Sequence, residues 1–168
     1  MIELETKIAT AIDLIPWTID MRDSFSVPME ERLFEADLNE VTAIIKGLGY
    51  QAKIYQSERG LVVMDRFCSI SYQCGIHVDY GHATLSPTAS LNDTVVGGLT
   101  ISWYNRYKKY LGESYEGYVS MPAFRNYGEM EVILCEYLKM YEKFKVAVHE
   151  SDFYASPESG FNPAIDET

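Results

Sequence analysis

The residue types best suited to catalysis gather in one short stretch of the chain, where His77, Asp79 and His82 follow one another closely. If this stretch forms a strand, His77 and Asp79 point to the same face, because side chains two residues apart in a strand share a face. A carboxylate beside an imidazole can orient a general base or hold a metal ion. The spacing matches no catalytic motif and lacks the two-histidine helix of zinc hydrolases. A polar strand face is therefore the alternative interpretation.

Other reactive groups have weaker patterns. Cys68, Cys74 and Cys135 are three in number and include no C-x-x-C pair, which predicts free thiols in a reducing compartment rather than a disulfide framework. No serine lies in a G-x-S-x-G turn, and Gly97-Gly98 is not followed by the lysine of a phosphate-binding loop. We therefore expect no cofactor and no metal site. His77, Asp79 and His82 remain the candidate site if the protein is an enzyme.

Apolar residues at helical spacing predict two helices in the first part of the chain. The first, over residues 2–15, has one apolar stripe and ends at Pro16. The second is expected to begin after Pro28 and to end at Gly47 or Gly49, because proline is favoured at a helix start and glycine just past its end. Its apolar stripe would consist of Phe34, Leu38, Val41, Ile45 and Leu48.

The middle of the chain has the alternation that is typical of β-strands. Residues 50–80 are rich in β-branched and aromatic side chains, with turn signals between the runs. Residues 70–80 alternate cleanly, with Tyr80 on the apolar side, which predicts an antiparallel sheet with one buried face and one solvent-facing side. Residues 86–92 combine proline, serine and threonine, and we expect them to form a connector.

Two further helices are expected after the sheet. Residues 96–112 have helical spacing, weakened by Gly97-Gly98, and their aromatic and basic residues at 103–110 would suit stacked bases or an anion if they were not buried. The loop at 113–128 is rich in aromatic residues. The clearest helical stripe of the chain consists of Met130, Leu134, Tyr137, Tyr141, Phe144 and Val148.

These elements together predict an α+β fold in two layers, with a three- to four-stranded antiparallel sheet flanked by about four helices. The strands lie too close together in the sequence for parallel crossovers. A length of 168 residues, of which 47% are hydrophobic, suits a single core. We expect one domain over residues 1–151 and an acidic, flexible C-terminal tail over residues 152–168.

The net charge of −11 is unevenly distributed along the chain. Residues 1–45 and 113–168 each have a net charge of −7, whereas residues 46–112 have a net charge of +3. Such acidity argues against direct binding of nucleic acid and against anionic membranes. Glu3 and Glu5 stand where a secretory signal would be positive, and no apolar run is long enough to span a membrane, so a cytoplasmic location is expected.

Carboxylates and tyrosines are the expected contacts with a partner. Like charges on successive helical turns destabilise a helix slightly, so their retention favours a surface that steers a partner, although a solvated helix face is the alternative. Tyrosine is a frequent anchor at protein interfaces, although rings in this loop could equally cap the core. The expected contact residues are Glu30, Glu31, Glu35, Asp37 and Glu40 on the second helix, and Tyr115, Tyr118 and Phe124 in the loop.

The leading hypothesis is a non-enzymatic, acidic binding protein that covers a basic groove of a target protein, one built to hold nucleic acid. Immunity proteins that neutralise toxins and phage-encoded proteins that block host defence share this general profile, which is an analogy of class only. The main alternative is a small enzyme or ligand-binding domain with a site at His77, Asp79 and His82. A third interpretation is a structural homo-oligomer that uses the last helix, and a homodimer is also compatible with an inhibitor.

Overall fold

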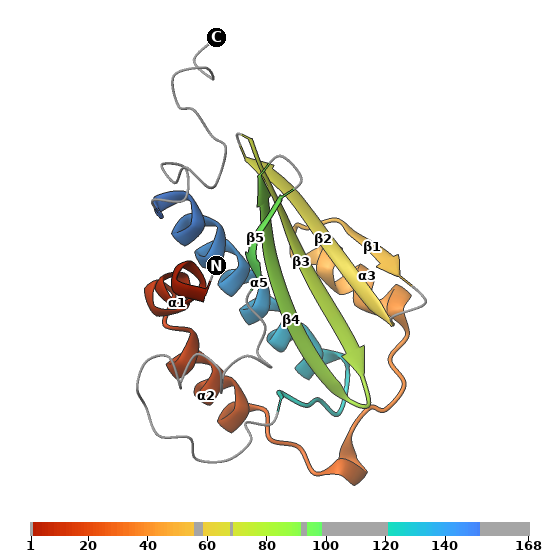
Figure 1. Ribbon diagram of the computed structural model, residues 1–168. Helices are drawn as coiled ribbons and strands as arrows, with labels where there is room; N and C mark the ends of the chain where they lie inside the picture. The colour runs from red at the N-terminus through yellow and green to blue at the C-terminus, as the bar shows by residue number, and fades with distance from the viewer. Residues whose placement is uncertain (1, 56–58, 68, 92–93, 99–120, 152–168) are drawn as a thin grey trace, which may run out of the picture.

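A computed structural model describes residues 2–55, 59–67, 69–91, 94–98 and 121–151 (Figure 1). One antiparallel sheet has the strand order β1-β2-β3-β4-β5. Its strands are β1 (Ala52–Tyr55), β2 (Gly60–Phe67), β3 (Ile70–Asp79), β4 (His82–Leu91) and β5 (Thr94–Gly98). The helices of the described residues are α1 (Ile2–Ala11), α2 (Leu14–Ser24), the single 3-10 turn η1 (Met29–Glu31), α3 (Leu38–Gly47) and α5 (Tyr127–Glu150). The predicted α+β architecture is confirmed.

The inner face of the sheet carries the core. Ile76 of β3 lies opposite Leu61 of β2 and Leu85 of β4, and all three side chains are buried. The predicted alternation along β3 is confirmed, with a single exception at its end. The buried residues are Ile70, Tyr72, Cys74, Ile76 and Val78. Tyr80, which the pattern assigned to this buried side, lies in the turn after β3 and is 66% exposed.

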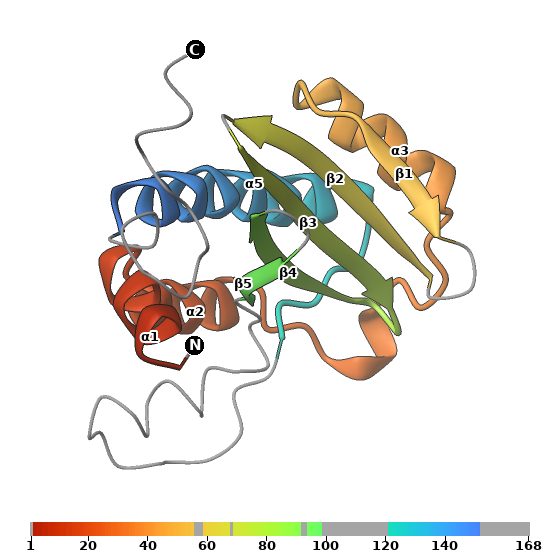
Figure 2. The same ribbon diagram turned by 45° about the horizontal axis from the view of Figure 1, so that its top comes forward.

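Helices α3 and α5 cover the inner face, and Figure 2 shows α5 running behind the sheet across its strands. All six residues of the predicted α5 stripe are buried. The helix begins at Asn126, whose side chain accepts a hydrogen bond from the backbone N–H of Glu129 (3.0 Å). The Tyr137 hydroxyl donates to the carbonyl of Ala83 in β4 (2.6 Å), so α5 is tied to the start of β4.

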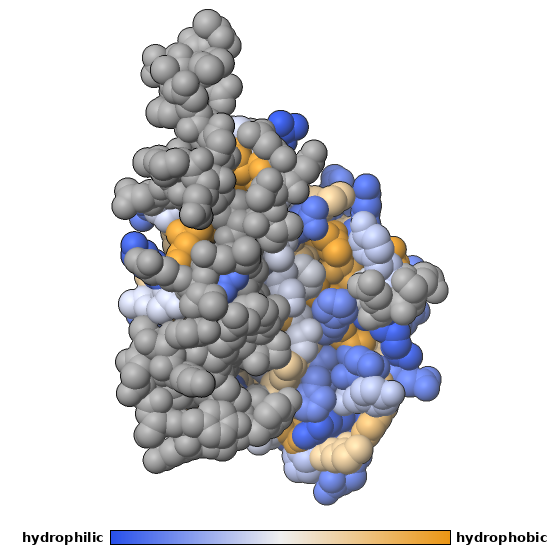
Figure 3. Space-filling view, in the orientation of Figure 1, coloured by the Kyte–Doolittle hydropathy of each residue, from blue (hydrophilic) through white to orange (hydrophobic). Residues whose placement is uncertain are grey.

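The outer face of the sheet is the predicted solvent-facing side. Its exposed side chains on the first three strands are Lys53, Tyr55, Met64, Arg66 and Gln73. Figure 3, seen from this side, shows hydrophilic and hydrophobic residues mixed over the part of the surface that is coloured. This side of the sheet is therefore a mixed surface of polar and apolar side chains, while the other side is covered by helices.

The prediction of one helix from Pro28 to Gly47 is wrong in its first half. After η1 the backbone at Arg32 is extended (φ −76°, ψ 146°), and α3 begins only after Asp37. The Asp37 carboxylate accepts the backbone N–H of Asn39 (2.8 Å), which is the contact that starts a helix. This start signal lies inside the stretch that the apolar spacing from Phe34 and the proline at position 28 had joined into one predicted helix.

Tertiary hydrogen bonds explain why residues 29–37 leave the helical path. The N–H of Leu33 donates to the carbonyl of Phe124 (3.0 Å), a residue far away in the sequence. Phe34, which was expected in the buried stripe, is 38% exposed as a result. The glutamates of this stretch therefore do not share one helix face with Glu40.

Three other sequence predictions are corrected. Pro16 does not end the first helix, because it lies in the first turn of α2, where its missing N–H costs little. Residues 86–91 are not a connector but the second half of β4, and Pro87 is tolerated because β5 pairs with β4 only from Thr88 onward. Val96 lies in β5 rather than in a helix, so the sheet has one strand more than the predicted maximum.

Several predicted features lie outside the described residues. They are the helix beyond residue 98, Cys68, Tyr115, Tyr118 and the tail at 152–168.

Candidate functional site

His77 and Asp79 share the outer face of β3, as predicted, and both lie beside the start of β2, Asp79 near Arg59 and His77 near Gly60. The Asp79 carboxylate forms an ion pair with Arg59, which precedes β2 (3.7 Å). The His77 imidazole lies over Gly60 of β2, where an added Cβ would come within 2.9 Å of the ring Nδ1. The absence of a side chain at Gly60 thus makes room for this ring. The arrangement is typical of a polar strand face.

His82, the third candidate, is the first residue of β4, and both of its ring nitrogens have partners in the fold. Nε2 faces Nη1 of Arg32, and Nδ1 lies 3.2 Å from the carbonyl oxygen of Met121. A guanidinium only donates hydrogen bonds, so Nε2 must accept and Nδ1 must carry the proton. Burial, and then the positive charge of Arg32, lower the pKa of His82 below its ordinary value. His82 is therefore a neutral structural acceptor at neutral pH.

The turn between β3 and β4, Asp79–His82, is here called the hairpin turn. Tyr80 and Gly81 have positive φ angles of 49° and 71°, which is the two-residue geometry that matches the twist of paired strands. Gly81 also lies against Arg32, because an added Cβ would come within 2.5 Å of the Arg32 Cβ. Glycine at position 81 thus satisfies both the turn and this close approach.

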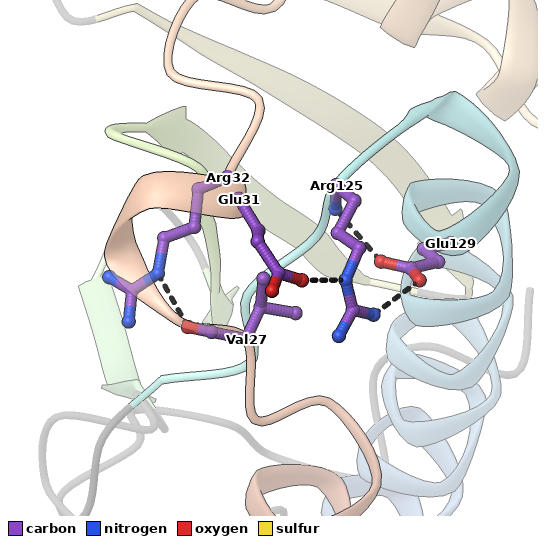
Figure 4. Close-up of polar contacts among 5 residues, drawn as sticks. All are labelled: Val27, Glu31, Arg32, Arg125 and Glu129. Atoms are coloured by element: carbon purple, nitrogen blue, oxygen red, sulfur yellow. Dashed lines mark hydrogen bonds and ion pairs between the residues drawn. The ribbon is translucent and has the colours of Figure 1, made fainter.

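Two distant segments meet at the hairpin turn. The N–H of Phe124 donates to the carbonyl of Gly81 (3.0 Å), and the Phe124 carbonyl in turn accepts from Leu33 (3.0 Å). The Arg32 Nε donates to the carbonyl of Val27 (2.9 Å), as Figure 4 shows. These bonds fix the path of the backbone from Val27 to Leu33, where the first glutamates of the chain's acidic stretch lie.

The predicted acidic contacts lie on residues 29–40, which we call the acidic segment. Glu31 accepts a hydrogen bond from Arg125 (2.8 Å), and Arg125 also bonds to Glu129 (2.8 Å), so this part of the segment is tied to the start of α5 (Figure 4). Asp37 caps α3. All five predicted carboxylates are exposed: Glu30, Glu31, Glu35, Asp37 and Glu40.

Exposed apolar side chains accompany these carboxylates. Met29 is 63% exposed and Phe34 is 38% exposed, while Tyr80 of the hairpin turn is 66% exposed. The contact of Arg32 with Gly81 brings the acidic segment against the hairpin turn. Met29 and Phe34 stand on either side of Arg32 in the sequence, and Tyr80 precedes Gly81. Phe124, in contrast, is fully buried, and its prediction as an exposed partner contact is wrong because it packs in the core beneath this junction.

Sequence reasoning missed Arg32 as the organiser of this site. One signal was present, since Arg32 is the single basic residue among the five carboxylates of the acidic segment. The glycine of the hairpin turn was a second signal, because a residue pair ending in glycine between alternating strands indicates a tight hairpin. Their mutual contact is a tertiary feature that no local pattern predicts.

Cys74 and the polar contacts of Lys145 are part of the structural framework rather than of a site. Burial raises the pKa of the Cys74 thiol far above its ordinary value, so the thiol stays protonated and unreactive. Lys145 of α5 bonds to Asp65 of β2 (2.6 Å) and to Glu142 (2.9 Å), and Glu142 also accepts from the Tyr50 hydroxyl (2.7 Å). This network anchors α5 to the β2 side of the sheet.

Within the described ranges, no three His, Cys, Asp or Glu side chains are grouped so that they could hold a metal ion. The helices in that part of the chain are also too short or too polar to cross a membrane. Comparison with protein-family models, curated proteins and solved structures finds no match. The function must therefore be inferred from the chain's own residues.

Proposed function

We propose that this protein is a non-enzymatic inhibitor that binds a target protein through the acidic segment and the hairpin turn. The observation that carries the proposal is the set of exposed apolar side chains, Met29, Phe34 and Tyr80, accompanied by exposed carboxylates on a backbone held by tertiary hydrogen bonds. Protein interfaces combine an apolar, aromatic centre with a polar rim, and the anchors at the centre supply most of the binding energy. In the proposed complex the three apolar side chains would supply the centre and the carboxylates the rim.

The charge of the surface indicates the chemistry of the target. Five carboxylates in twelve residues complement a groove lined by lysine and arginine, such as one that holds nucleic acid, and they would accelerate association by electrostatic steering. The protein would then act as a nucleic-acid mimic in the cytoplasm, in the manner of an immunity-type or anti-defence protein. Tyr115 and Tyr118 stay predicted contacts of the same target.

A fixed backbone favours this role. Binding a loop that must first become ordered costs conformational entropy, whereas a segment already held in place loses less freedom. Arg32 and Arg125 hold the acidic segment at two points, through Val27 and His82 in one case and through Glu31 and Glu129 in the other. Met29 lies between Val27 and Glu31, and Phe34 follows Leu33, whose N–H bonds to Phe124, so both apolar side chains stand on a backbone that is already held in place.

The alternative functions have less support. An enzyme site at His77, Asp79 and His82 would need a free imidazole nitrogen on His82, and both of its ring nitrogens already have partners in the fold. A homo-oligomer through α5 stays a prediction, for which Val132 and Val146 are exposed side chains on that helix (51% and 55%).

The proposal is tested by capturing the target with the tagged full-length protein from its native cell. The test variant carries Glu30→Gln and Glu35→Gln, and the matched control carries Glu131→Gln and Glu150→Gln, which remove the same charge from exposed sites on α5. We expect the wild type and the control to retain one target at low salt. The test variant should bind that target about tenfold more weakly, since each rim charge contributes about 0.5–1 kcal/mol.

Equal retention by the test and control variants would place the binding site elsewhere on the molecule. Retention that does not decrease at high salt would contradict the electrostatic part of the proposal, because screened carboxylates cannot steer a basic partner.

A further inference from the structure

We propose that the contact between Arg32 and His82 is a pH-sensitive latch that releases the acidic segment when His82 takes up a proton. The latch rests on the proposed function only for its biological role, as a device that weakens target binding in mild acid. Its structural basis is the junction of the acidic segment with the hairpin turn.

One side chain makes this junction. The Arg32 guanidinium donates through Nε to the carbonyl of Val27 (2.9 Å) and through Nη1 to the Nε2 of His82. The Cβ of the same residue lies against Gly81. The other ring nitrogen of His82 donates to the carbonyl of Met121. The imidazole therefore links the acidic segment to the residues that lead into α5, and it can do so only while Nε2 keeps its lone pair.

The charges around His82 make protonation incompatible with this link. The acidic segment presents a cation, the Arg32 guanidinium, to the imidazole. From β3, the carboxylate of Asp79 stands opposite His82 in register, but it is engaged by Arg59. Met121 and Pro122 present backbone groups to the ring, and Arg125 is directed to Glu31 and Glu129.

A proton on Nε2 would therefore set an imidazolium directly against a guanidinium and remove the acceptor between them. Arg32 must then withdraw from His82, and the stretch between Val27 and Leu33 loses one of its two side-chain attachments, the other being the bond of Glu31 to Arg125. The lowered pKa of His82 reflects the same conflict, with burial as its first cause and Arg32 as its second. Each unit by which folding lowers a pKa corresponds to a change of about tenfold in the coupled equilibrium.

Amide hydrogen exchange of the protein alone tests the latch. The Leu33 amide, which donates to Phe124, reports on the attachment of the acidic segment. After correction for the intrinsic pH dependence, we expect its exchange to accelerate between about pH 7.5 and about pH 5.5 in the wild type, by at most about tenfold because pH 5.5 lies about one unit below the ordinary pKa of histidine. In His82→Gln the acceleration should be absent, because the amide oxygen accepts from Arg32 at both pH values. His77→Gln is the matched control and should behave as the wild type.

A titration of the wild-type histidines by NMR keeps the test independent of how well His82→Gln folds. We expect His82 to be the Nδ1–H tautomer, and we expect Arg32→Gln to raise its pKa towards the ordinary value. Unchanged Leu33 exchange in the wild type, or acceleration that persists in His82→Gln, would overturn the latch. Neither result would affect target capture at neutral pH, so failure of the latch and failure of the proposed function are distinguishable.

Discussion

Substitution of Gly81 by alanine tests the junction on which the candidate site depends. Gly81 has a φ of +71°, and its Cβ would come within 2.5 Å of the Arg32 Cβ. Gly49 is the matched control, because it also has a positive φ (+93°) but would have no neighbouring atom within 4 Å of an added Cβ. The two alanine variants therefore share the backbone strain and differ in the contact with Arg32.

The expected costs follow from these two terms. A left-handed conformation costs an alanine about 1–2 kcal/mol, which applies to both sites. At Gly81 the added methyl must also displace Arg32, and overpacking of this kind costs about 1–3 kcal/mol more. We expect Gly81→Ala to lower the free energy of unfolding by about 2–5 kcal/mol and Gly49→Ala to lower it by about 1–2 kcal/mol.

Urea denaturation followed by circular dichroism measures both changes, provided that the slope of the unfolding curve is the same in the two variants and the wild type. Equal destabilisation by the two substitutions would refute the reasoning. It would mean that Arg32 does not pack against the hairpin turn, and the acidic segment would then lack one of the contacts that hold it in place for the proposed function.

Two further predictions concern stability. Tyr137→Phe should lower the free energy of unfolding, measured by urea denaturation, by about 1–2 kcal/mol because it leaves the buried Ala83 carbonyl without its donor. Tyr141→Phe should be close to neutral, since within the described residues the buried Tyr141 hydroxyl has no hydrogen-bond partner. Equal effects of the two substitutions would contradict this reasoning. The free energy of unfolding should fall as the pH drops below about 6.5, because folding lowers the pKa of His82 and the unfolded chain then binds a proton that the folded chain does not. This contribution is fully present above that pH, and a urea series across pH should show that His82→Gln lacks it.

The sequence predicted those parts of the fold that depend on local periodicity. The stripe from Met130 to Val148 recurs over many turns, so the helix could be inferred from spacing alone, whereas its start at the Asn126 cap was not predicted. The alternation of β3 was equally clear, because the helices cover one face of the sheet and leave the other to polar residues.

The errors arose where tertiary contacts decide the local structure. Residues 29–37 were assigned to a helix from Pro28 and from the stripe that starts at Phe34, yet Leu33 bonds to Phe124 and Arg32 to His82, and both partners lie far away in the sequence. Phe124 was predicted to be exposed because it lies in a loop, but the loop returns to the sheet and buries it. Hydrophobic spacing carries no information on such contacts.

The candidate site was therefore predicted in part. Exposure of Glu30, Glu35 and Glu40 followed from their charge, whereas the arrangement of the acidic segment against the hairpin turn did not. Met29 and Tyr80 were missed as exposed apolar neighbours because apolar residues are expected inside by default.

Carboxylate footprinting of the complex between this protein and its captured target tests the central claim most directly. Exposed carboxylates are labelled with a carbodiimide and an amine, and mass spectrometry compares labelling with and without the target. The account predicts that Glu30 and Glu35 are protected in the complex while Glu131 and Glu150 are labelled as in the free protein. Full labelling of Glu30 and Glu35 in a complex that protects carboxylates on α5 would contradict the assignment of the acidic segment as the binding surface.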